Sequence, residues 1–265
     1  MPKENEQPEV NEHSVPLKAI TARKILAESW GFKELFPIGY TDPYRTMDRL
    51  CEHLESGGSA VGVSTHPSLE DVLRVFKFYF QWPEIRERRF GGPAAVHQMK
   101  LINLFSKPVS AETAPVVTEH SIDNKRKKHK EPYDRITISR YLRGYNNLII
   151  DILGNNGLLI VASQADQAPI LKPPEKDPVK VVLDRITKAN LQNVLIIPMG
   201  FEIEGIEDYS KVRHVTAKRS TYVFHVGKSY TSTELLAISE DRKMTPDYFI
   251  YIQQRQLVPP AYRSE

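Results

Sequence analysis

From Ser59 to Asp71 the chain reads Ser-Ala-Val-Gly-Val-Ser-Thr-His-Pro-Ser-Leu-Glu-Asp. The apolar run that opens this stretch predicts a buried strand, and the run breaks at His66. A helical pattern begins soon afterwards, so Asp71 falls in the first turn of the next predicted helix. A strand, a turn and a helix in succession form the repeating unit of an α/β fold.

Two further apolar runs predict buried strands, at Leu158–Ala162 and Asn193–Pro198, and another strand is predicted at Tyr222–Val226. Strands that are apolar along their whole length are typical of parallel sheets covered on both faces. The sequence therefore predicts an α/β fold. Its central sheet is mixed but mostly parallel, it is flanked by helices, and an N-terminal helical segment precedes it.

Apolar spacing and end signals predict the helices that cover this sheet. They are expected at Pro43–Leu54, at Tyr133–Leu153 and from Pro246, which Thr245 caps. The stretch Ala168–Lys180 contains four prolines and is predicted to be a loop.

The chain divides into three predicted parts. Residues 1–16 are polar and are expected to form a disordered tail, residues 17–56 the N-terminal helical segment, and residues 57–265 the α/β domain. Within the segment, Leu17–Phe36 has an apolar stripe surrounded by lysine and arginine. Packing on the core and contact with a membrane surface both stay open as uses of that stripe.

Composition excludes several classes of protein. No stretch of the 265 residues approaches the roughly 20 apolar residues of a membrane span, so a soluble or peripheral protein is expected. The low cysteine content agrees with a reducing cytoplasm, and peripheral contact at the inner membrane is left open. A single cysteine, Cys51, excludes an internal disulfide and is interpreted as a buried bystander. The eight histidines lack ligand spacing, so no metal is expected, and a net charge of +3 is too small to predict nucleic-acid binding.

His66 and Asp71 form a candidate catalytic pair. An aspartate that accepts a hydrogen bond from one ring nitrogen fixes the tautomer and raises the basicity of the other nitrogen, which can then take a proton from a hydroxyl. The structural alternative is a capping box from Ser68 to Asp71, which would only satisfy amides at the helix start. The position favours catalysis, because α/β sheets bind ligands where strands end and helices begin.

The spacing from His66 to Asp71 resembles the first motif of the glycerolipid acyltransferase family, the enzymes that make lysophosphatidate and phosphatidate. Leu159–Ala165 is similar to the family's apolar strand and Pro-Glu-Gly-like turn, and Ile196–Pro198 to its strand ending in Val-Pro. The likeness continues through Gly227–Tyr230 and the closing helix, and it covers most of residues 57–265, which the resemblance makes an acyltransferase domain.

The resemblance implies direct transfer of a fatty acyl group from an acyl-CoA or acyl-carrier-protein thioester to a hydroxyl. The implied acceptors are glycerol-3-phosphate, lysophosphatidate or a related polar alcohol. His66 would be the general base and Asp71 would steady the imidazolium. No cofactor is implied, because the CoA or carrier protein is itself a substrate.

Five residues are the candidate substrate-binding set: Ser68, Lys125, Arg126, Gln164 and Pro198. Lys125 and Arg126 belong to a basic cluster, 125–130, which is either a solvated surface or a phosphate site. Gln164 takes the place of the family's glutamate, and the stretch after it lacks the family's glycine and arginine. Two alternatives therefore stay open: an inactive relative that binds lipid or acyl carrier, and a thioester hydrolase.

Overall fold

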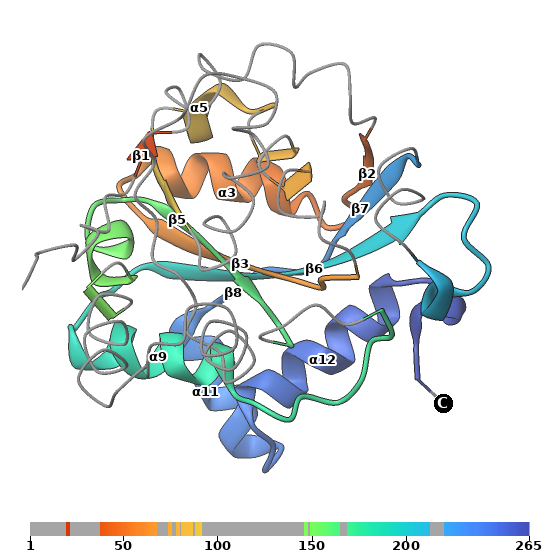
Figure 1. The fold of residues 1–265 in the computed structure, drawn as a ribbon. Coiled ribbons are helices and arrows are strands. Elements are labelled where there is room, and N and C mark those ends of the chain that lie inside the picture. The colour runs from red at the N-terminus through yellow and green to blue at the C-terminus, as the bar shows by residue number, and fades with distance from the viewer. Residues whose placement is uncertain are drawn as a thin grey trace, which may run out of the picture.

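The fold is an α/β sheet with helices on both faces, as Figure 1 shows. It is a computed structural model. The residues it describes are 20–21, 38–67, 74–75, 78–79, 81–86, 88–91, 146–147, 149–164, 169–212 and 220–264.

The strands form one mixed sheet in the order β1-β4-β5-β3-β6-β7-β2, and β8 also pairs with β6. Their bounds are β1 (Ile20–Thr21), β2 (Ile38–Thr41), β3 (Ser59–Ser64), β4 (Arg89–Gly91), β5 (Leu158–Ala162), β6 (Val194–Ile203), β7 (Tyr222–Val226) and β8 (Tyr230–Thr231). The four strands β4, β5, β3 and β6 run parallel to one another. The strands β7 and β2 run parallel to each other. The predicted mostly parallel sheet is confirmed.

Helices cover both faces of the sheet. In Figure 1, α3 and α5 lie on one face and α9, α11 and α12 on the other. Their bounds are α3 (Thr46–Glu55), α5 (Pro83–Arg86), α9 (Pro178–Lys188), α11 (Ser232–Asp241) and α12 (Pro246–Leu257), with short 3-10 turns η1 (Tyr209–Lys211) and η2 (Pro260–Tyr262).

β3 is buried along its whole length because it has neighbours on both edges and both faces. Successive side chains of a strand point to opposite faces. Ala60 accordingly packs into the same cluster as Leu50 of α3, whereas Val61 and Val63 pack with Leu183 of α9 on the other side. The apolar run of β3 thus contributes side chains to both halves of the core, one on each face of the sheet.

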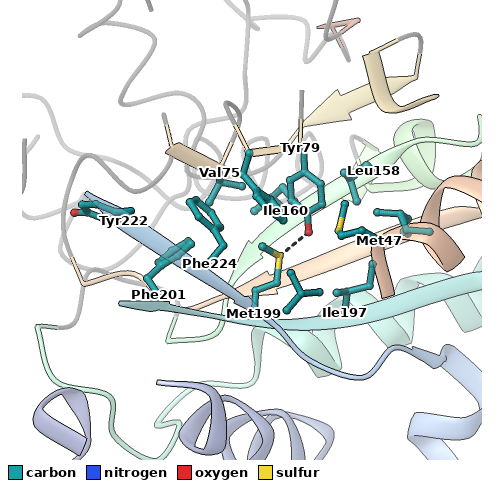
Figure 2. Packing of buried hydrophobic residues seen from close by; sticks show 14 of the residues in the cluster. Met47, Val75, Tyr79, Leu158, Ile160, Ile197, Met199, Phe201, Tyr222 and Phe224 are labelled. Atoms are coloured by element: carbon teal, nitrogen blue, oxygen red, sulfur yellow. Dashed lines mark hydrogen bonds between the residues drawn. The ribbon is translucent and has the colours of Figure 1, made fainter. Parts of the chain in front are cut away.

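Aromatic rings fill the core on the α3 side (Figure 2). The ring centroids of Phe78 and Phe224 lie 4.5 Å apart, and those of Phe201 and Phe224 lie 4.6 Å apart. Deeper in the same cluster, the Tyr79 hydroxyl donates to Met199 Sδ at 2.7 Å. Burial raises the pKa of Tyr79 well above its ordinary value, so this hydroxyl stays protonated and acts as a donor.

Gly62 of β3 gives a direct test of this packing. A Cβ at this position would lie 2.5 Å from Tyr79 Oη and 2.7 Å from Ile160 Cδ1, both in the core. We expect Gly62→Ala to lower the free energy of unfolding by about 1–3 kcal/mol, because the core must shift to admit the methyl group.

Gly39→Ala is the matched control, because its Cβ would lie 3.7 Å from Val223 Cγ2, which is an ordinary contact. Urea unfolding of both variants measures the two effects. Equal stability of the two variants would contradict the packing described around Tyr79.

β6 is longer than the sequence predicts, because it continues past Pro198 to Ile203. The strand changes partner at this proline: Ile196 pairs with β8, and Met199 pairs with β7. Pro198 O accepts from Gly227 N at 2.9 Å. The N–H and the C=O of a strand residue point to the same edge, so the missing N–H of Pro198 falls at the gap between β8 and β7. The proline therefore costs no ladder hydrogen bond, and the prediction that it ends the strand is wrong.

The predicted loop Ala168–Lys180 also extends too far, because α9 begins at Pro178. A proline is well tolerated in the first turn of a helix, where its missing N–H has no intrahelical partner. The remaining N–H groups are satisfied from elsewhere in the chain: Asp247 accepts from Val179 N at 2.7 Å and from Lys180 N at 2.9 Å.

The predicted N-terminal helical segment, 17–56, is not wholly helical. Within its described residues, Ile20–Thr21 forms β1 and Ile38–Thr41 forms β2, followed by α3. Both strands complete edges of the main sheet, where they satisfy backbone groups of β4 and β7. The rest of the predicted helix Leu17–Phe36 lies outside the described residues.

Candidate functional site

The candidate site is the edge of the sheet where the parallel strands β3 and β5 end. Ser64 pairs with Ala162 of β5 on one side and with Met199 of β6 on the other. Ser163 N donates to Ser64 O at 2.9 Å, which extends the ladder by one residue. The residues that follow β3 and β5 therefore leave the sheet side by side.

His66 lies two residues beyond β3 and is half-buried. The preceding Thr65 is buried and fixes the direction of the chain at this point. Its N–H donates to Met199 O at 3.2 Å, and its Oγ1 accepts from Phe201 N at 3.2 Å. Histidine thus follows a rigid strand end directly, as the sequence predicts.

Gln164 lies two residues beyond β5, at the matching position on the neighbouring strand. Its Nε2 donates to Lys172 O at 3.2 Å. Gln164 Oε1 and Ser163 Oγ are buried and have no hydrogen-bond partner in the part of the chain that the structure describes. Buried polar atoms are seldom left unpaired, so this strand end has capacity to bind a polar group or a water molecule.

Gln254 of α12 is a residue of this edge that sequence reasoning missed. Its fully buried side chain donates from Nε2 to Val63 O at 2.9 Å and to Met199 O at 3.0 Å. It therefore joins the end of β3 to the middle of β6 from the α12 face of the sheet. The sequence feature that could have revealed this residue is a glutamine one helical turn after the buried Ile250, on the face of α12 that meets the sheet.

The third predicted site residue that the structure describes, Pro198, lies within β6 and pairs with Val63. Close by, α12 approaches β6 tightly, because a Cβ on Gly200 would lie 2.7 Å from Val258 Cγ1. Pro198 is thus part of the sheet backbone and supplies no reactive group.

Four of the predicted site residues lie outside the described residues: Ser68, Asp71, Lys125 and Arg126. The pairing of His66 with Asp71 and the phosphate site in the basic cluster therefore stay predictions. In the described part, His66 and Gln164 follow the paired strands β3 and β5, and Pro198 lies within β6, the other neighbour of β3.

Neither a metal site nor a membrane span is found among the described residues. No three of their His, Cys, Asp and Glu side chains gather as potential metal ligands. None of the described helices is long and apolar enough to cross a membrane.

Cys51 lies on α3 and is half-buried. Burial, followed by the negative charge of Glu84, raises the pKa of its thiol to about 12. Since only the thiolate is nucleophilic, we expect iodoacetamide at about pH 8 to alkylate Cys51 at least about 100-fold more slowly than free cysteine. Mass spectrometry of the intact protein over time measures the rate, and alkylation as fast as that of free cysteine would contradict this account.

Comparison with known proteins adds no relative. No protein-family model matches the chain, and no curated protein matches it significantly.

Proposed function

We propose that the protein is an acyltransferase of the glycerolipid type. It moves a fatty acyl group from an acyl-CoA or acyl-carrier-protein thioester to a hydroxyl of glycerol-3-phosphate, lysophosphatidate or a related polar acceptor. The observation that carries the proposal is the position of His66 directly after the central parallel strand, beside the end of β5. In open α/β sheets, ligands bind outside the carboxyl ends of the strands.

His66 is the general base in this mechanism. Its imidazole takes the proton of the acceptor hydroxyl as the oxygen attacks the thioester carbonyl carbon. The C–S bond then breaks, and the leaving thiolate receives that proton from the imidazolium. Asp71 holds the ring orientation, so no covalent acyl-enzyme is required.

The neighbouring strand ends support binding of the polar acceptor. Gln164 has a buried oxygen without a partner among the described residues, and an amide oxygen accepts a hydrogen bond from a hydroxyl. Lys125 and Arg126 supply positive charge for a phosphate group in this proposal.

A panel of acceptors tests the proposal. Purified protein is incubated with palmitoyl-CoA or a palmitoyl carrier protein, and the lipid products are identified by mass spectrometry. We expect an ester of glycerol-3-phosphate or lysophosphatidate. Esters formed only with phosphate-free alcohols would remove the assigned role of the basic cluster, and free palmitate as the sole product would replace the proposal with a hydrolase.

A further inference from the structure

A second polar array lies on the β6–β7–β2 end of the sheet, and none of its residues belongs to the proposed acyltransferase site. Thr41 is the last residue of β2, His225 lies in β7 and Glu202 lies in β6. Thr41 and His225 are register partners. Because Phe224 is buried in the core on the α3 side, His225 next to it points to the opposite face.

The three side chains form a continuous chain of hydrogen-bonding groups. His225 Nδ1 lies 2.8 Å from Thr41 Oγ1, and His225 Nε2 lies 3.0 Å from Glu202 Oε2. A carboxylate only accepts hydrogen bonds, so the neutral imidazole carries its proton on Nε2. Nδ1 is then an acceptor, and the Thr41 hydroxyl donates to it.

We propose that Thr41 is a nucleophile, activated by His225 as base and oriented by Glu202, that takes an acyl group from small activated esters. A hydroxyl, an imidazole and a carboxylate in this sequence of contacts is the arrangement that activates nucleophiles in several unrelated folds. Here the ring is reversed, because Nδ1 rather than Nε2 faces the hydroxyl.

The reaction with an aryl ester is a simple displacement. The oxygen Oγ1 of Thr41 forms a bond to the ester carbonyl carbon while its proton moves to His225 Nδ1. The bond from that carbon to the aryl oxygen breaks, and the phenolate leaves. The proton on His225 passes to solvent. Water then attacks the same carbonyl carbon and gives a proton to His225, the bond from that carbon to Oγ1 breaks, and Oγ1 takes the proton from His225 as the free acid leaves.

Access to the array suits this role. Thr41 is exposed, whereas the side chain of His225 is only 17% exposed. A small ester therefore reaches the hydroxyl, and the base is shielded from most of the solvent. β2 is the last strand in the order of the described sheet, and an edge strand presents backbone N–H groups that can bind a carbonyl oxygen.

Labelling by p-nitrophenyl acetate tests the proposal. Release of nitrophenolate is followed by absorbance, and the acetylated residue is located by peptide mass spectrometry. We expect the acetyl group on Thr41, its loss in Thr41→Val and its retention in Thr41→Ser. His225→Gln and Glu202→Gln should each slow labelling at least about tenfold, because general-base assistance is lost.

Thr233→Val is the matched control, since Thr233 is an exposed threonine on α11. The Thr233→Val variant should be acetylated on Thr41 at the wild-type rate. Thermal melts establish that each variant is folded. Acetylation confined to lysines or to other residues would overturn the proposal. So would unchanged labelling of Thr41 in folded His225→Gln. Both results are independent of His66 and of the proposed acyltransferase activity.

Discussion

Replacement of His66 by alanine should lower the rate of acyl transfer at least about 100-fold, which corresponds to about 3 kcal/mol in the activation barrier. The reason is that the acceptor hydroxyl is a poor nucleophile until a base removes its proton. The Michaelis constant for the thioester should change little, because in the proposed mechanism the imidazole contacts the acceptor and not the acyl chain. The two kinetic constants are measured with the donor and acceptor that give product.

His53→Gln is the matched control for this substitution. His53 Nε2 lies 3.0 Å from Ser59 O, at the opposite end of β3, and a glutamine can still donate there. We expect this variant to keep its activity. An equal loss in both variants would mean that the histidines act on stability, and wild-type rates in folded His66→Ala would remove His66 from the mechanism.

Asp247 should make the folded state less stable as the pH rises from about 4 to about 8. Burial raises the pKa of its carboxyl to about 6, although the amides of Val179 and Lys180 favour the charged form. Between the unfolded and folded pKa values the folded state binds more protons, so this stabilising contribution is lost as the pH rises through about 6. A shift of about two pKa units corresponds to on the order of 2–3 kcal/mol.

Asp247→Asn isolates this contribution from those of other carboxyl groups. The difference in unfolding free energy between wild type and variant is measured by urea denaturation at about pH 4 and about pH 8. We expect the unfolding free energy of the wild type, relative to that of Asp247→Asn, to fall by on the order of 2–3 kcal/mol between the lower and the higher pH. Asp184→Asn, on the exposed side of α9, is the control, and its effect should stay within about 0.5 kcal/mol. A wild-type advantage that grows with pH would show that the two N–H bonds outweigh burial.

Much of the sheet could be predicted because its strands carry a strong local signal. The apolar runs at β5 and β7 coincide with the predicted strands, and Thr245 caps α12 as expected by accepting from Tyr248 N. These strands and this helix cap are determined by residues that are close together in the sequence, so they could be predicted from it. The predicted bounds of β6 and α9 are wrong because proline usually interrupts regular structure, whereas Pro198 and Pro178 each fall where an N–H is not needed.

The candidate site was only partly predictable. His66 could be placed at a strand end because the apolar run ends at Val63, three residues before it. Gln254 could not be identified, because its role depends on α12 packing against the end of β3 and the middle of β6, which are far away in sequence. The same holds for Asp247, whose carboxylate satisfies the first amides of α9, and for the contact of Thr41 with His225.

Release of free thiol from palmitoyl-CoA, followed with and without glycerol-3-phosphate, tests the central claim most directly. The account predicts that release depends on the acceptor and disappears in His66→Ala. Release at the same rate without acceptor would identify a hydrolase instead. Absence of release with folded wild-type protein, also when palmitoyl carrier protein and the other acceptors replace these substrates, would contradict the assignment of this sheet edge as a catalytic site.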